Sequence, residues 1–193
     1  MRAPPVVGVF VGGRGRRMGG MAKGLLPAPG GGTLIERLLV LCRSCLPEAP
    51  LVLVGEASAY AGCQLPVLAD APSGIGPLGG LRALLRYAAA GRHECVLVLA
   101  CDLPYVSARW VGALATALPE AIAVAPRVDG LWYPLSARYS TAALASVEEA
   151  IERREHSLQA LFTRWGELAH ALPASEAEMD ELSDWDRPED IRF

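Results

Sequence analysis

Short apolar runs alternate with longer amphipathic segments along this chain, and the alternation predicts its secondary structure. The runs are rich in Val and Leu, as buried strands are, and they predict strands over residues 6–11, 51–54, 67–68, 95–100 and 121–125, with a turn and a further strand in 128–135. Apolar residues at helical spacing predict helices over residues 33–45, 78–90, 107–118, 141–154 and 157–165. Strands that alternate with helices form parallel βαβ units, and helices cover both faces of such a sheet. The pattern therefore predicts an α/β fold, a three-layer α/β/α sandwich with a mostly parallel, Rossmann-like sheet, in a single domain over residues 1–193.

Composition and charge predict a cytoplasmic globular domain and argue against several other classes. The chain has 193 residues, of which 52% are hydrophobic and 20% are charged, so it can bury one sizeable core. Its net charge of -3 provides no general attraction to nucleic acid or to anionic membranes. No apolar run approaches the roughly 20 residues of a membrane helix, and the N-terminal segment is too short for a signal peptide. The five cysteines, an odd number at irregular spacing, do not match a disulfide framework.

The first predicted strand continues into a loop that is rich in glycine and in cations. The loop contains Gly12, Gly13, Arg14, Gly15, Arg16 and Arg17, and Lys23 follows it. Glycine lets the backbone approach an anion closely, because no Cβ intervenes, and successive amides form an anion-binding concavity. Arginine and lysine add fixed positive charge. A polyphosphate is the natural ligand of such a loop, although a glycine-rich turn with solvated arginines has the same composition.

Two better-known phosphate-binding loops do not match this segment. A P-loop requires Ser or Thr directly after its lysine, and Gly24 stands there. A dinucleotide-binding fingerprint requires a third glycine at the position that Met18 occupies. The loop therefore belongs to neither class.

Two aspartates follow later strands, at the edge where parallel sheets bind ligands. Asp70 begins a glycine-rich loop that leads into a helix at Pro77, so its amides can face a ligand. An ordinary strand-to-helix connection has the same features. Asp102 follows the apolar run 95–100. Mg²⁺ is bound by one or two carboxylates together with substrate phosphates, so a lone Asp beside a phosphate loop suits that metal. A helix N-cap or a structural ion pair is the alternative role of Asp102.

Four segments, taken together, resemble the molybdenum cofactor guanylyltransferases, a family of nucleotidyltransferases. They are residues 10–23 (Phe-Val-Gly-Gly-Arg-Gly-Arg-Arg-Met-Gly-Gly-Met-Ala-Lys), residues 76–81 (Gly-Pro-Leu-Gly-Gly-Leu), residues 101–104 (Cys-Asp-Leu-Pro) and, more loosely, residues 184–191 (Asp-Trp-Asp-Arg-Pro-Glu-Asp-Ile). Each match is modest alone, and the four together span nearly the whole chain. The sequence departs from the family at Gly15 and Ala22, where Ser and Asp are usual, and at Asp184 and Asp186, where Asn is usual.

The resemblance implies a nucleotidyltransferase fold and a role for several residues. It implies that the first loop carries a purine nucleotide on its backbone, through Phe10, Val11, Gly12 and Gly13. It also implies that Lys23 contacts the triphosphate, that Asp70 lies in the nucleotide site and that Asp102 binds Mg²⁺. We expect Lys23 and Arg17 to stabilise the charge that grows on the leaving pyrophosphate. In that family, the segment around Trp132 and Tyr133 faces the acceptor, and a core role suits these aromatic residues equally.

The activity that the resemblance implies is the transfer of GMP from GTP to the phosphate of molybdopterin, with Mg²⁺ as the metal. GTP and molybdopterin are then the partners, and molybdoenzymes or their chaperones are candidate recipients of the product. The pair Gly12-Gly13 resembles the guanylyl form, whereas cytidylyl relatives usually carry Ala-Ala-Gly. A cytidylyltransferase or another nucleotidyltransferase of the same fold is the alternative activity, and a non-catalytic cofactor-binding adaptor is the alternative class.

Overall fold

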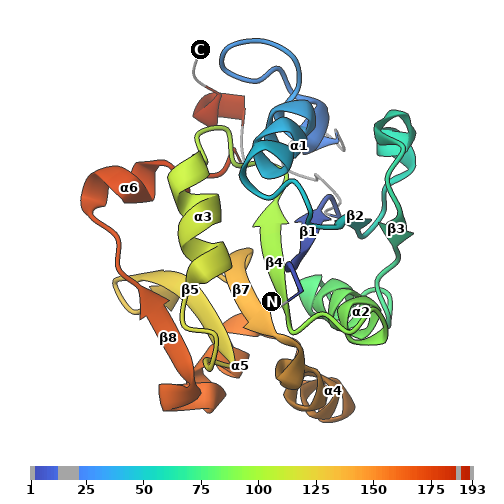
Figure 1. The fold of residues 1–193 in the computed structure, drawn as a ribbon, viewed down its shortest axis with the longest axis vertical. Helices are drawn as coiled ribbons and strands as arrows, with labels where there is room; N and C mark the ends of the chain where they lie inside the picture. Colours follow the sequence, from blue (N-terminus) through green and yellow to red (C-terminus); the bar gives the residue numbers. More distant parts are fainter. Residues whose placement is uncertain (1–2, 13–21, 186–187, 192–193) are drawn as a thin grey trace.

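The computed structural model describes residues 3–12, 22–185 and 188–191, and its α/β fold confirms the sequence prediction. The strands are β1 (Val6–Phe10), β2 (Leu51–Val54), β3 (Val67–Leu68), β4 (Cys95–Ala100), β5 (Ala123–Val128), β6 (Leu131–Trp132), β7 (Ser136–Ser140) and β8 (Ala169–Leu172). They pair in the order β3-β2-β1-β4-β7-β5-β6, and β8 pairs with β5 (Figure 1). Strands β1 to β4 are parallel, as are β5 and β8. Strand β7 runs antiparallel between β4 and β5, so the sheet is mostly parallel.

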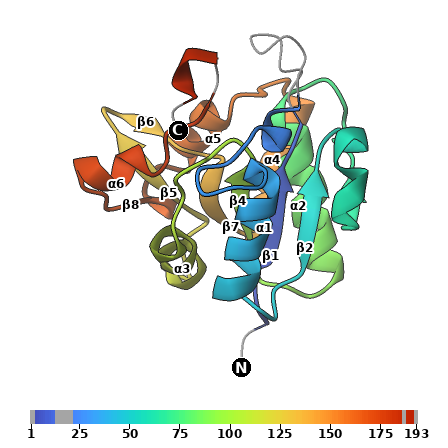
Figure 2. The ribbon, with the colours of Figure 1, turned by 90° about the horizontal axis from the view of Figure 1, so that it is seen from above.

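Helices cover both faces of the sheet and produce the predicted three layers (Figure 2). The α-helices are α1 (Leu34–Cys45), α2 (Pro77–Ala90), α3 (Ala108–Thr116), α4 (Leu144–Glu152), α5 (Leu158–Trp165) and α6 (Glu176–Asp180). The short 3-10 helices are η2 (Lys23–Leu25), η3 (Ser58–Cys63), η4 (Thr141–Ala143), η5 (Gly166–Leu168) and η6 (Pro188–Asp190). Helices α1 and α3 share a buried core with one face of the sheet, and α2, α4 and α5 share another core with the opposite face.

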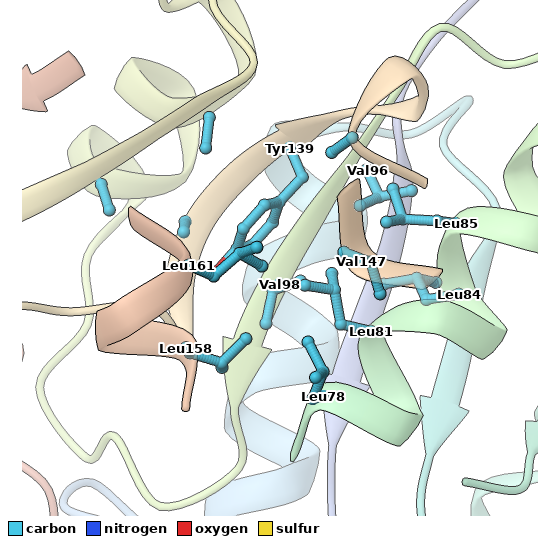
Figure 3. Close-up of a cluster of buried hydrophobic side chains, with 14 of the residues drawn as sticks. Leu78, Leu81, Leu84, Leu85, Val96, Val98, Tyr139, Val147, Leu158 and Leu161 are labelled. Atoms are coloured by element: carbon cyan, nitrogen blue, oxygen red, sulfur yellow. The ribbon is translucent and has the colours of Figure 1, made fainter. Parts of the chain in front are cut away.

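Alternate residues of each central strand contribute to the two cores, as the period of a β-strand requires. In β4, Val96 and Val98 face the core of α2, α4 and α5, where they meet Leu81 and Leu84 of α2 (Figure 3). The intervening Leu97 and Leu99 belong to the core of α1 and α3. Helix α2 lies very close to β1, because a Cβ on Gly8 would stand 2.4 Å from Cδ2 of Leu84.

The register of the central strands brings their carboxyl ends to one level. Phe10 at the end of β1 pairs with Val54 of β2 on one side and with Ala100 of β4 on the other. The segments that follow these three strands therefore leave the sheet next to one another. They begin with Val11, Gly55 and Cys101, which places the predicted site residues at a common edge.

Two strands differ from the sequence prediction. Neither β7 nor β8 was predicted, because neither has the apolar run by which the other strands were identified. Within β7, Arg138 is only 4% exposed and donates to the carbonyl oxygens of Leu118 and Pro119, both at 3.3 Å. The sequence alone makes such an arginine look like a surface residue, because the distant carbonyl oxygens that accept its hydrogen bonds cannot be seen in it.

Helix boundaries agree closely with the pattern, with one difference in capping. Thr33 and Glu36 form the reciprocal capping box at the start of α1 that their spacing predicts. Ser107 precedes α3 as expected, but its side chain makes no capping hydrogen bond, and the helix ends at Thr116 rather than near Leu118.

All five cysteines carry free thiols, as their irregular spacing predicts. Burial raises the pKa of the Cys42 and Cys101 thiols to about 12, so both stay neutral near pH 7. Within the described residues, the helices are all too short or too polar to cross a membrane.

Candidate active site

Lys23 and Asp102 form an ion pair at the carboxyl ends of β1 and β4. Lys23 Nζ lies 2.8 Å from Asp102 Oδ2, and the two side chains are 18% and 15% exposed. Lys23 begins the short helix η2, and Asp102 follows β4. The ion pair that the sequence allowed as an alternative for Asp102 is therefore present, and its partner is the lysine that follows the predicted phosphate loop.

A small cavity of about 100 Å³ opens beside this pair. Its walls are formed by Phe10, Val11, Gly12, Lys23, Ala100, Cys101, Asp102 and Leu135. Three residues of the predicted nucleotide loop are thus brought together with the predicted lysine and aspartate. Gly13 and Arg17, which were predicted to act with them, lie outside the described residues.

Gly12 packs directly against Gly55, the residue that follows β2. A Cβ on Gly55 would stand 2.7 Å from Cα of Gly12 and 2.8 Å from its backbone nitrogen. Gly55 also has a φ of +105°, a backbone conformation that residues with a side chain rarely adopt. The absence of a side chain at Gly55 therefore lets the loops after β1 and β2 touch, and it holds the Gly12 backbone at the cavity wall.

Asp70 lies beside the same loops, but it does not line the Lys23 cavity. Its Oδ1 is 3.0 Å from the position of a Cβ on Gly80 and 3.8 Å from that of a Cβ on Gly55. Burial raises the pKa of this carboxyl above its ordinary value. The following residue, Ala71, is held by Nη1 of Arg82, which donates to its carbonyl oxygen at 3.1 Å. Asp70 thus stands on the β3 side of the sheet edge and Asp102 on the β4 side.

A second cavity, of about 350 Å³, shares Lys23 and Asp102 with the first. Its further walls come from the segment around β6 and β7 and from the C-terminal segment: Ala100, Leu103, Trp132, Tyr133, Pro134, Leu135, Ser136, Leu182 and Asp184. The backbone N–H of Trp185 donates to the carbonyl oxygen of Asp102 at 3.0 Å. This contact ties the C-terminal segment to the end of β4 and brings the Asp184 side chain to the same cavity as Asp102.

The two aromatic residues of the predicted acceptor segment differ in their surroundings. Trp132 is 8% exposed, and its ring packs against Phe162 with 4.7 Å between centroids, while the Arg127 guanidinium lies 4.9 Å from the Trp132 ring. Tyr133 is half-buried and lines both the second cavity and a neighbouring cavity beside the C-terminal segment. Trp132 is therefore mainly a core residue, whereas Tyr133 can contact a ligand.

The site suits a divalent cation that is shared with phosphate groups. Among the residues that the structure describes, no three His, Cys, Asp or Glu side chains gather into a metal-binding group. The ion pair uses Oδ2 of Asp102, so Oδ1 remains available as a ligand, and Asp184 is a second carboxylate in the same cavity. Mg²⁺ typically takes one or two carboxylates and completes its coordination with phosphates and water.

Sequence reasoning missed one residue that supports the ion pair. The hydroxyl of Tyr60, in η3, accepts a hydrogen bond from the backbone N–H of Gly24 and lies near Cys101, which are the neighbours of Lys23 and Asp102 in the chain. These contacts span 36 and 41 positions, so no local pattern indicates them.

The chain has a mostly parallel sheet, and a lysine and an aspartate meet across the ends of β1 and β4. The family model that matches the chain identifies this domain as a nucleotidyltransferase. Within that class, the chain belongs to the family of MobA-like NTP transferase domains, which matches residues 7–171.

Curated relatives agree with this membership over nearly the whole chain. A probable molybdenum cofactor guanylyltransferase of Opitutus terrae is 36% identical over 188 residues, which cover 94% of this chain and 90% of the relative. The molybdenum cofactor guanylyltransferase of Pseudomonas fluorescens is 34% identical, with 93% and 90% coverage. Among solved structures, molybdopterin-guanine dinucleotide biosynthesis protein A of Archaeoglobus fulgidus has the same fold, with a TM-score of 0.74, 24% identity and coverage of 95% and 93%.

Proposed function

We propose that the protein transfers GMP from GTP to the phosphate of molybdopterin and releases pyrophosphate, in a reaction that depends on Mg²⁺. The Lys23–Asp102 pair carries this proposal, because it stands between two cavities at the edge where parallel sheets bind ligands. The names of the curated relatives support GTP and a molybdenum cofactor as the substrates.

We assign GTP to the smaller cavity and to the loop after β1. Phe10, Val11 and Gly12 line this cavity, and we expect their backbone, together with Gly13, to bind the nucleotide. Asp70 would contribute to the nucleotide site from the β3 side, next to Gly55 and Gly80. Lys23 is in contact range of a triphosphate that enters the cavity, since its side chain forms part of the wall.

We assign molybdopterin to the larger cavity. Tyr133 offers an aromatic ring on which a pterin can stack. Because this cavity shares Lys23 and Asp102 with the first, a phosphate bound in it would lie next to the α-phosphate of GTP. Positioning two reactants side by side in this way supplies a large part of the catalysis of phosphoryl and nucleotidyl transfer.

The chemistry needs charge stabilisation more than proton transfer. An oxygen of the acceptor phosphate forms a bond to the α-phosphorus of GTP, the bond from that phosphorus to the β-phosphate oxygen breaks, and pyrophosphate leaves. The nucleophile is already an anion, so no strong general base is required. Lys23 and Arg17 would stabilise the charge that grows on the leaving group. Asp102, with Asp184 beside it, would hold Mg²⁺, which supplies neutralisation of the phosphate charges when bound.

The proposal is tested by the release of pyrophosphate from each of GTP, CTP, ATP and UTP, with purified molybdopterin and with or without Mg²⁺. We expect release from GTP alone, and only with Mg²⁺ and acceptor present. The Asp102→Ala variant is the negative control, and we expect it to remain folded and inactive. Release from CTP instead of GTP would identify a cytidylyltransferase, and GTP binding without release would favour the adaptor. We expect the reaction in the cytoplasm, with molybdoenzymes or their chaperones as recipients of the product.

A further inference from the structure

Tyr60 contacts the residues next to Lys23 and Asp102 in the chain, and it lies in a segment that no sequence motif marks. It belongs to η3, between β2 and β3, and it is only 3% exposed. Its hydroxyl oxygen accepts a hydrogen bond from the backbone N–H of Gly24 at 3.1 Å and lies 4.0 Å from Sγ of Cys101. Gly24 is the residue after Lys23, and Cys101 is the residue before Asp102. One side chain therefore contacts both chain segments that carry the ion pair.

The packing around Gly24 leaves this arrangement little freedom. A Cβ on Gly24 would stand 2.9 Å from Cε1 of Tyr60 and 3.3 Å from Cβ of Cys101. The tyrosine ring thus fills the space between the lysine turn and the end of β4. If the ring keeps its place but loses its hydroxyl, the N–H of Gly24 loses its acceptor in a buried environment, and the turn must shift to find another.

The support that Tyr60 gives is electrically neutral. Burial is the main cause that raises the pKa of the Tyr60 hydroxyl well above its ordinary range. This hydroxyl therefore stays neutral near pH 7 and does not compete with Asp102 for the ammonium of Lys23.

We propose that Tyr60 is a positioning residue for nucleotidyl transfer, and that its hydroxyl fixes the turn at Gly24 so that Lys23 is aimed at the reacting phosphates beside Asp102. The inference rests on the proposed function, because it gives Lys23 a role on the leaving group. Tyr60 itself does not contact a substrate in this scheme. It acts through the backbone of its neighbour.

The test is a double-mutant cycle with Tyr60→Phe and Lys23→Ala. In the otherwise unchanged protein, we expect Tyr60→Phe to lower the kcat of pyrophosphate release by about tenfold. In the Lys23→Ala background, the same change should alter the residual kcat by less than about twofold, because residues that act through one another are not additive. Equal losses in both backgrounds, or no loss in the first, would overturn the proposal. Val111→Ala, a truncation in the same core but on α3, is the control for a loss of stability alone.

A second measurement needs no turnover and so separates this inference from the proposed function. Lys23 is the only lysine of the chain, so an amine reagent can modify only Lys23 and the N-terminus. We expect acetic anhydride, followed by mass spectrometry, to modify Lys23 at least about threefold faster in Tyr60→Phe, since a loosened turn exposes the amine. The N-terminal amine is the internal standard. An unchanged ratio of the two rates would reject the positioning role, even if GTP proved not to be the substrate.

Discussion

The ammonium nitrogen of Lys23 lies 2.8 Å from Oδ2 of Asp102, although 79 positions separate the two residues in the chain. Lys23 is also the sole lysine, since the other seventeen residues of the Lys and Arg total are arginine. An ammonium is a compact charge with three rotatable donors, whereas a guanidinium is a planar fork. The pocket beside Asp102 therefore holds the smaller cation in a chain that otherwise uses the larger one.

We predict that Lys23→Arg lowers the kcat of pyrophosphate release by about 100-fold or more, even though it keeps the charge. The planar guanidinium spreads its charge over a fork of donors, so it cannot place one compact cation 2.8 Å from Oδ2 of Asp102 as the ammonium does. Steady-state kinetics with GTP and molybdopterin provide the measurement. Arg153→Lys, at an exposed position on the far end of α4, should retain full activity. Wild-type turnover by the Lys23→Arg protein would contradict the argument.

The contact between Gly12 and Gly55 gives a prediction about stability. Gly55→Ala should lower the free energy of unfolding by about 2 kcal/mol or more, because a new Cβ meets the Gly12 backbone and φ is positive. Urea denaturation measures the loss. Gly112→Ala is the matched control: a Cβ there meets nothing within 4 Å, and the position is inside α3. That change should stabilise the protein by about 0.5–1 kcal/mol. A Gly55→Ala protein as stable as the unsubstituted chain would mean that the two loops can separate freely.

Periodicity predicted most of this fold because the central strands are buried on both faces. Strands β2 and β4 begin and end where the apolar runs do, since nearly every position in such a buried strand favours Val or Leu. Strand β7 escaped prediction because Ser136, Arg138 and Ser140 look polar, and only tertiary contacts explain why Ser136 and Arg138 are buried. Alternation of apolar and polar residues is a local signal, whereas the satisfaction of a buried arginine by distant carbonyls is not.

The candidate site divides in the same way. The proximity of Lys23 and Asp102 could be predicted, because Asp102 directly follows an apolar strand, Lys23 comes after the loop that leaves β1, and parallel strands end together. The Tyr60 contact could not, because its partners are 36 and 41 positions away. Asp184 drew attention in the sequence only as a departure from the family, and its place in the cavity with Asp102 depends on how the C-terminal segment folds back. The roles of Gly13 and Arg17 stay predictions.

Asp70 gives a prediction about pH. Burial raises the pKa of its carboxyl above the ordinary value of 3.8. The unfolded chain therefore loses this proton at a lower pH than the folded protein, and the ionised group destabilises the fold. The penalty is absent below pH 3.8, grows as the pH rises toward the folded-state pKa, and is complete above it.

We therefore predict that Asp70→Asn raises the Tm of the ligand-free protein relative to the unsubstituted chain, with a difference that increases from about pH 3 upward and then levels off. Thermal unfolding across a pH series measures it. The same variant should bind GTP more weakly, because a residue that serves binding often lowers the stability of the ligand-free fold. Glu120→Gln, at an exposed loop position, is the control and should give no such trend. A Tm difference that is constant with pH would show that burial of the charge is not the cause.

Trp185 links the C-terminal segment to the site, so its removal should affect the acceptor more than the nucleotide. Its side chain is 2% exposed, packs with Leu26 and Leu34, and meets Tyr105 edge-on, with 6.2 Å between ring centroids. Truncation of such a buried ring costs about 3 kcal/mol or more. The backbone N–H of residue 185, which donates to the carbonyl oxygen of Asp102, remains in the variant, but the packing of the ring is lost. We therefore expect the segment that carries Asp184 to leave the larger cavity.

Trp185→Ala should raise the KM for molybdopterin by about tenfold or more, the equivalent of at least 1.4 kcal/mol, while the Kd for GTP measured by calorimetry should change by less than about twofold. The reason is geometric: the C-terminal segment borders the larger cavity, and none of its residues that the structure describes lines the smaller one. Trp165→Ala is the matched control, since it removes a ring of similar burial from the core on the other face of the sheet. It should lower stability without changing the ratio of the two affinities. If Trp185→Ala weakened GTP and molybdopterin equally, the two cavities could not be separate subsites, and the division of the edge between nucleotide and acceptor would have to be abandoned.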